Sequence, residues 1–186
     1  MNRPQRAVAA LAGVLLPAAP LLALHFADGP PARVTGGFGE DSCAACHSGQ
    51  PVNDGIGQLI LSGLPTQFVP GETYELVLSL TRPGLRAAGF QLAIRQVGDR
   101  AQAGKISVPP EQAEIALLDE RGVQFAHHSA PADPEADGEI VRWKLAWTAS
   151  ETGGTVVLHA SAIAGDGDDS QAGDFVYTLE QSAAAR

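Results

Sequence analysis

From residue 57 onwards, apolar and polar residues alternate with a period of two, the pattern of β-strands that bury one face. In residues 140–148, the aliphatic and tryptophan side chains share one face, and Arg142 and Lys144 lie on the other. Turn-forming residues separate the runs; Asp119-Glu120-Arg121-Gly122 is expected to close a hairpin. The pattern predicts an all-β fold, an antiparallel β-sandwich. The predicted strands are residues 58–62, 73–81, 89–97, 105–108, 115–118, 123–128, 140–148, 156–163 and 175–179.

The chain begins with the pattern of an export signal. Arg3 and Arg6 precede an apolar stretch, residues 7–27, that ends in small residues. Two prolines in this stretch oppose a regular transmembrane helix, although its length is close to the roughly 20 residues that a span needs. We therefore expect residues 1–27 to be a signal peptide, with an uncleaved membrane anchor as the alternative. Both interpretations of residues 1–27 predict a periplasmic or otherwise extracytoplasmic protein.

Residues 28–56 are rich in Gly, Pro and Asp and contain Cys43-Ala44-Ala45-Cys46-His47. C-x-x-C-H is the attachment sequence of c-type haem. Two thiols at this spacing can form thioethers with both vinyl groups of one porphyrin, and the following histidine is placed to ligate the iron. We predict one haem c, bound covalently by Cys43 and Cys46, with His47 as the proximal axial ligand. Residues 28–56 are then the attachment segment, and residues 57–181 the β-sandwich domain.

Three other interpretations of the two cysteines compete with haem. A thioredoxin-type pair precedes a helix in a βαβ unit, but loop-forming residues follow here. Structural zinc needs about four nitrogen or sulfur ligands, and the chain has only two cysteines. A disulfide between Cys43 and Cys46 fits an oxidising compartment but leaves His47 unexplained. Haem c accounts for all three residues, and it agrees with export.

The second axial position of the iron cannot be filled by methionine in the exported protein. The only methionine is Met1, which lies in the export signal. The position is therefore filled by histidine, by another side chain or by water, or it is open. A second histidine would give a lower reduction potential than methionine, because methionine raises it. The histidines to consider are His25, His127, His128 and His159.

His127 and His128 are adjacent at the end of the predicted strand 123–128. Neighbouring side chains on a strand point to opposite faces, so at most one of the pair faces the iron easily. We expect Val123, Phe125 and His127 to share the core face, and His128 to point outward, towards a haem outside the sandwich. His128 is the first candidate for the distal axial ligand and His127 the second. The competing interpretation is that both are surface histidines without a metal.

Charge excludes one large class of partners. The formal net charge is −9, and the predicted signal segment contributes two arginines and no acid. An exported domain this acidic opposes binding to nucleic acid or to anionic lipid through a basic patch. It favours a basic partner or none. If the protein transfers electrons, we expect that partner to be a redox protein.

An acidic cluster near the C-terminus, Gly165-Asp166-Gly167-Asp168-Asp169 with Asp174 after it, has a composition found in calcium-binding loops. It does not match the twelve-residue EF-hand pattern, and no helices flank it. We favour a solvated β-turn over a calcium site, because Asp and Gly are common turn residues.

Several segments together resemble the bacterial Reeler-like proteins called choice-of-anchor V domain proteins. The resemblance lies in residues 29–36, 43–48, 74–92, 143–149 and 164–174, and it covers nearly the whole exported part. It implies a Reeler-like, immunoglobulin-like β-sandwich outside the cytoplasm. It also points to a histidine within residues 124–129, best to His128. The chain departs from this family in having no C-terminal sorting or membrane segment, so a cell-surface anchor is not expected.

These features predict an exported monohaem c-type protein that transfers electrons and is not an enzyme. One alternative is a haem sensor or small haem enzyme with an open sixth position. The other is an extracytoplasmic binding or adhesion domain in which haem is structural. No Ser/His/Asp arrangement or pair of carboxylates indicates a hydrolase.

Overall fold

The structure, a computed structural model, describes residues 29–136 and 138–186, so the predicted signal segment and His25 lie outside the described residues. The described part contains one short 3-10 helix and ten strands. It has no helix that is long and apolar enough to span a membrane. The elements are η1 (Cys43–Ala45), β1 (Gln58–Ser62), β2 (Gln67–Phe68), β3 (Thr73–Thr81), β4 (Ala87–Gln96), β5 (Lys105–Ser107), β6 (Ile115–Glu120), β7 (Val123–His128), β8 (Ile140–Thr148), β9 (Thr155–Gly165) and β10 (Phe175–Ala185).

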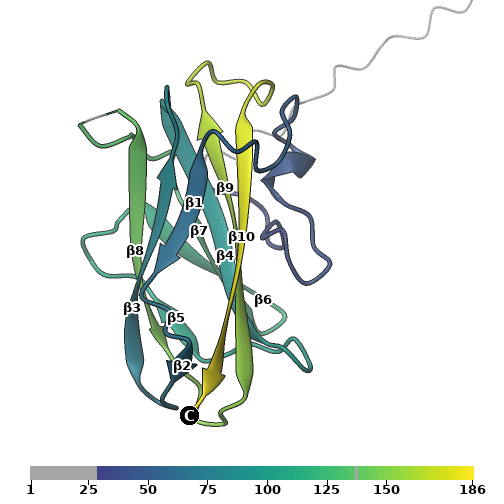
Figure 1. The fold of residues 1–186 in the computed structure, drawn as a ribbon, viewed down its shortest axis with the longest axis vertical. Coiled ribbons are helices and arrows are strands. Elements are labelled where there is room, and N and C mark those ends of the chain that lie inside the picture. Colours follow the sequence, from purple (N-terminus) through teal and green to yellow (C-terminus); the bar gives the residue numbers. More distant parts are fainter. Residues whose placement is uncertain (1–28, 137) are drawn as a thin grey trace, which may run out of the picture.

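The strands form two sheets that pack face to face as a sandwich (Figure 1). The four-stranded sheet has the order β1-β3-β8-β5, and the six-stranded sheet has the order β2-β10-β9-β4-β7-β6. The predicted all-β sandwich is confirmed. Pairing is antiparallel except between β2 and β10, which is parallel. The sequence pattern did not predict β2, because two residues are too short to show a period of two.

The strand ends agree closely with the alternating pattern. Strands β1, β3, β7 and β8 have the predicted bounds. Strand β10 runs on to Ala185, beyond the expected end of the domain, because its small C-terminal residues still pair with β9. The hairpin between β6 and β7 turns at Arg121 and Gly122, whose φ angles are 54° and 78°. Two consecutive positive φ angles are typical of the type I′ turn, so the hairpin is confirmed with a turn shorter than predicted.

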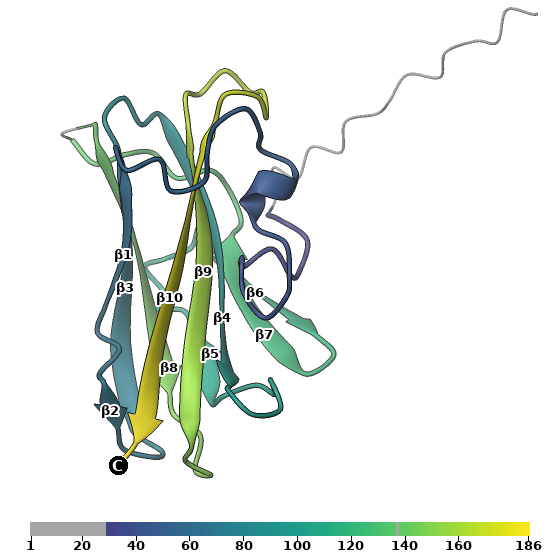
Figure 2. The same ribbon diagram turned by 45° about the vertical axis from the view of Figure 1, so that its right-hand side comes forward.

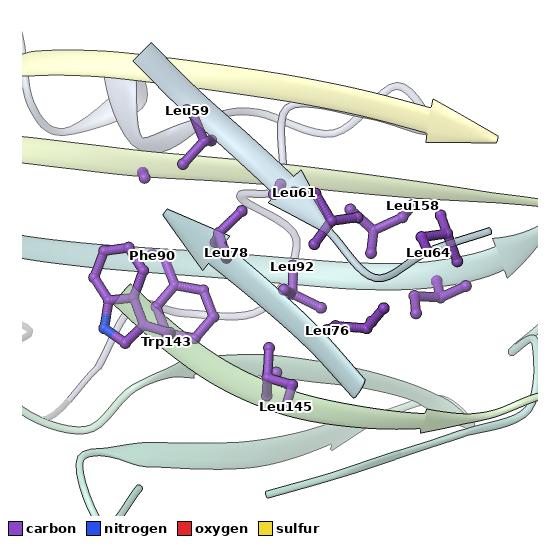
Figure 3. Close-up of a cluster of buried hydrophobic side chains, with 14 of the residues drawn as sticks. Leu59, Leu61, Leu64, Leu76, Leu78, Phe90, Leu92, Trp143, Leu145 and Leu158 are labelled. Atoms are coloured by element: carbon purple, nitrogen blue, oxygen red, sulfur yellow. The ribbon is translucent and has the colours of Figure 1, made fainter. Parts of the chain in front are cut away.

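The main core lies between the two sheets, and its members are spread along the chain from Leu59 to Ala183. Figure 3 shows part of this core. Its largest side chains are fully buried and include Trp143 and Phe90, whose ring centroids are 4.6 Å apart. On β8 the buried and exposed positions alternate as the sequence predicts. Burial of such side chains is worth roughly 1.5–3 kcal/mol each, so this core is the main source of stability.

The outer face of the six-stranded sheet is covered as well. Nearly every residue of β4 is buried, whereas a strand with one solvent-exposed face would alternate. The cover is the irregular segment 29–56, which lies beside β4 and β9 and contains η1 (Figure 2). The candidate site lies where this outer layer meets the six-stranded sheet.

Candidate functional site

Side chains on the outer face of the six-stranded sheet hold residues 29–56 in place. Gln91 on β4 accepts a hydrogen bond from the backbone N–H of Val34 (2.8 Å) and donates one to the carbonyl of Pro31 (2.8 Å). Ser161 on β9 accepts one from the N–H of Cys43 (3.1 Å). Gln91 and Ser161 are completely buried. Because buried polar groups need partners, these residues fix where the segment lies on the sheet.

An ion pair adds a second attachment. Arg95 of β4 and Glu40 of the segment are each 5 % exposed, and Nη2 of Arg95 lies 2.5 Å from Oε1 of Glu40. The guanidinium also lies over the ring of Phe38, 4.2 Å from its centroid. Phe38 in turn contacts the ring of His159 edge to face. The segment is therefore ordered by its side-chain contacts, although it has little regular secondary structure.

The C-x-x-C-H motif forms one turn of 3-10 helix. Ser42 caps it by accepting a hydrogen bond from the N–H of Ala44, and the N–H groups of Cys46 and His47 both donate to the carbonyl of Cys43. This turn buries Cys43, which is 6 % exposed, and leaves Cys46 exposed. Both are free thiols. Burial raises the pKa of the Cys43 thiol to about 11, so this sulfur is neutral at physiological pH.

The motif lines a cavity of about 350 Å³. This volume falls within the ~300–1,000 Å³ of small-molecule and cofactor sites. Cys43, Cys46 and His47 border the cavity, and so does His128, from the far end of β7. The structure thus brings together the motif and the first candidate for the distal ligand, which are distant in the sequence. The other lining residues are mostly small or apolar and include Pro30, Pro31, Val34, Ala87, Ala88, Gly89, Pro131 and Ile163.

His47 is held by a residue that the sequence did not single out for this role. Its Nδ1 lies 2.5 Å from Oδ2 of Asp174, and Asp174 is 5 % exposed. Ser48 forms a β-bridge with Ala172 through two backbone hydrogen bonds, and this bridge sets the loop before β10 beside the motif. Asp174 was grouped with the acidic loop on composition. Only the tertiary structure distinguishes it from its exposed neighbours.

His128 is 8 % exposed and is held by the backbone of Phe90. Its Nδ1 lies 3.0 Å from the amide nitrogen and 3.1 Å from the carbonyl oxygen of that residue. The ring fits because Gly89 has no side chain: an ideal Cβ there would lie 2.6 Å from Cε1 of His128. Burial is the main cause that lowers the pKa of His128; the backbone hydrogen bond to Phe90 raises the pKa in part, and the charges of His127 and His47 lower it. His128 is therefore neutral at physiological pH.

The second candidate, His127, is held in another way. Its Nδ1 lies 2.7 Å from the carbonyl oxygen of His128, and its ring lies against Gly29. It is not among the residues that line the cavity. His159 is also away from the cavity lining, against Gly37 and Phe38. Of the histidines whose positions the structure describes, His47 and His128 share the cavity.

The expected faces of β7 were wrong. Ala126 belongs to the main core, whereas Val123 and Phe125 form a smaller cluster with Ala93, against which Ala32 of the attachment segment packs. Both faces of β7 are buried, so hydrophobicity does not reveal which one meets the other sheet. His128 reaches the cavity because its ring lies beside Gly89, which pairs with the cavity residue Ile163.

The acidic loop behaves mainly as a turn. Asp166 accepts a hydrogen bond from the N–H of Asp168, and Asp168 accepts one from the N–H of Ser170. Such contacts are the Asx turns of exposed loops. Within residues 29–136 and 138–186, no three His, Cys, Asp or Glu side chains are grouped closely enough to hold a bare metal ion.

Comparison with solved structures identifies the architecture. The Reelin-N domain of F-spondin matches with a TM-score of 0.54 and 21% sequence identity, over 77% of this chain and 95% of that one. The fold is Reeler-like. The human F-spondin reeler domain (fragment 1) gives a TM-score of 0.48 at 21% identity, over 70% of this chain and 89% of that one. No family model and no curated protein sequence matches the chain.

The chemistry available in this Reeler-like domain comes from four groups around one cavity. Two thiols lie on one turn, a histidine has one ring nitrogen bonded to a carboxylate, and a second histidine is buried and neutral. A thioether is neutral, so Cys43 can be buried in that form without the cost of a buried charge. The two thiols and the two histidines therefore fit the requirements of a covalently attached haem.

Proposed function

We propose that this chain is an exported monohaem c-type protein that transfers electrons. The observation that carries the proposal is the shared cavity: Cys43, Cys46 and His47 line it together with His128. The attachment motif predicts the first three residues from sequence alone, and the fold supplies a second histidine in the same space. Covalent attachment and two axial histidines form one set of haem ligands that needs no methionine, and these residues would supply it.

Each residue has a distinct task in this proposal. Cys43 and Cys46 would hold the porphyrin through thioethers, and His47 and His128 would supply the axial nitrogens. The bound haem would supply one-electron redox chemistry at its iron. Metal-ligating histidine must be neutral. The buried environment of His128, which lowers its pKa, supports that state.

The surface supports a protein partner of opposite charge. Asp168 and Asp169 line the cavity and are exposed, and the whole chain has a formal net charge of −9. Positive patches on a partner would be steered towards such a rim, and salt would weaken the association. We therefore propose a basic redox protein as the partner, in the periplasm or another extracytoplasmic space.

The direct test is expression with an export signal in cells that carry the haem c maturation machinery. Covalent haem that survives denaturing electrophoresis, and that shows reduced-minus-oxidised absorption bands, would support the proposal. The double variant Cys43→Ala/Cys46→Ala should carry no covalent haem. Wild-type protein that matures without any haem would overturn the proposal.

A second candidate function is a haem sensor or small haem enzyme with an open sixth position. One contact favours it: Nδ1 of His128 lies 3.0 Å from the N–H nitrogen of Phe90. If Nδ1 accepts that hydrogen bond, Nε2 carries the ring proton and cannot ligate iron. If Nδ1 instead donates to the Phe90 carbonyl, Nε2 is free. A high-spin ferric spectrum with rapid carbon monoxide binding by the ferrous form indicates the open site, and a low-spin spectrum indicates two histidine ligands.

A further inference from the structure

Asp174 is a nearly buried carboxylate whose close side-chain contact is His47. It is 5 % exposed, and its Oδ2 lies 2.5 Å from Nδ1 of His47. On its other side an ideal Cβ at Gly165 would lie 3.3 Å from Oδ1, so a larger residue there would crowd the carboxylate. Burying a charged group without a partner is costly, so this geometry ties Asp174 to the histidine.

The contact determines which nitrogen of His47 is free. A carboxylate only accepts hydrogen bonds, so the hydrogen between the two groups belongs to Nδ1 of His47. A neutral imidazole carries one N–H and one lone pair. With its hydrogen on Nδ1, His47 offers its lone pair at Nε2. This is the tautomer that metal-ligating histidines have when a carboxylate or carbonyl holds the other nitrogen.

We propose that Asp174 is a positioning residue that sets the tautomer of His47 and lowers the reduction potential of the bound haem. A carboxylate that accepts the Nδ1 hydrogen raises the basicity of the imidazole. A more basic ligand stabilises ferric iron more than ferrous iron, so the potential falls. This inference rests on the proposed haem attachment to Cys43 and Cys46.

Asp168 provides the matched control. It also lines the cavity and carries a carboxylate, but it is exposed, and its Oδ1 accepts a hydrogen bond from the N–H of Ser170 (2.8 Å). Removing its charge tests the general electrostatic effect of one carboxylate near the site. Removing the charge of Asp174 tests that effect together with the bond to His47.

The first experiment compares haem-loaded wild type, Asp174→Asn and Asp168→Asn in redox titrations. At a fixed solution potential, the ratio of reduced to oxidised haem should rise at least about tenfold in Asp174→Asn, or ~59 mV for a one-electron couple. The ratio should change much less in Asp168→Asn. Equal changes in both variants, or none in Asp174→Asn, would overturn the inference.

A second experiment needs no haem. Nitrogen NMR of histidine-labelled apoprotein at mildly alkaline pH should show His47 with its hydrogen on Nδ1, and Asp174→Ala, which removes the acceptor, should lose that preference. If this variant does not fold, the wild-type spectrum decides alone, because a hydrogen on Nε2 would contradict the inference. Failure of the wild type to attach haem would overturn the proposed function, whereas the NMR result would still report on the Asp174–His47 pair.

Discussion

The ring of His128 fills the space in which a side chain on Gly89 would stand. An ideal Cβ on Gly89 would lie 2.6 Å from Cε1 and 2.8 Å from Nδ1 of that ring, closer than non-bonded atoms approach. Gly89 lies in strand β4 and is not among the residues with positive φ, so its backbone does not require glycine. We conclude that this glycine makes room for the candidate distal histidine.

Gly89→Ala should displace His128 without abolishing covalent haem. In a strand, alanine normally loses less conformational entropy on folding than glycine does. A change in the haem spectrum of Gly89→Ala would therefore come from the clash with His128. If His128 ligates the iron, the visible spectrum should change from low spin to a high-spin or mixed form. Gly98→Ala is the control, because a Cβ at Gly98 meets nothing within 4 Å. An unchanged low-spin spectrum in Gly89→Ala would contradict the role given to Gly89.

His128→Ala should change the haem spectrum in the same direction, and the ferrous form should then bind carbon monoxide rapidly. His159→Ala serves as the comparison, because His159 lies against Gly37 and Phe38 and away from the cavity lining. His127→Ala should also leave the spectrum low spin. A loss of the low-spin signal in His127→Ala alone would reverse the order of the two candidates. Absorption spectra of both oxidation states measure these outcomes.

Glu40→Gln should destabilise the domain, because it leaves the buried Arg95 without its charged partner. Removing one member of a buried ion pair typically costs about 3–5 kcal/mol. Glu135→Gln is the matched control, since Glu135 and Arg142 pair on the surface, with 48% and 42% of their side chains exposed. An exposed pair contributes at most ~1 kcal/mol. Urea denaturation of both variants measures the difference, and equal losses would contradict the assignment of Arg95 and Glu40 as a buried attachment.

The apoprotein should lose stability as the pH falls below about 6.5, the ordinary pKa of histidine. Burial is the main cause that lowers the pKa of both His128 and His159 in the folded state. The unfolded chain therefore takes up protons first, which favours unfolding until the pH passes below the folded pKa values. Above the unfolded pKa both states are neutral and this effect is absent.

Urea denaturation between about pH 7.5 and 5.5 measures this dependence. The variant His128→Gln should show a flatter profile than wild type, because it removes one of the two contributing groups. A wild-type profile that is level across this window, or that rises towards acid pH, would rule out the proposed linkage.

Much of the sandwich could be predicted because several strands bury only one face. The alternation in β1, β3 and β8 gave their bounds, and the inward tryptophans of β8 lie in the core as predicted. The alternating pattern did not predict the faces of β7 correctly. Phe125 packs in the smaller cluster with Ala32 of the attachment segment, whereas Ala126 belongs to the main core between the sheets. A strand buried on both faces carries no signal that tells them apart.

Only part of the candidate site could be predicted from the sequence. Cys43, Cys46 and His47 could be predicted because covalent haem requires a fixed local spacing. Asp174 and Gly89 have no such spacing: one looked like part of an acidic loop and the other like an ordinary strand glycine. Their importance depends on contacts between distant segments, and these contacts appear only once the sheet brings β4, β7 and the loop before β10 to one end of the domain.

Different interactions stabilise the sandwich and the outer layer formed by residues 29–56. The main core is a cluster of apolar side chains whose members lie between Leu59 and Ala183 in the sequence. Residues 29–56 are instead attached largely by polar groups, such as Gln91, Ser161 and the Arg95–Glu40 pair. Local opening of such a layer costs less than global unfolding. Residues 29–56 should therefore exchange their amide hydrogens and admit proteases while the ten strands remain folded, so this outer layer can be remodelled without changing the core beneath it.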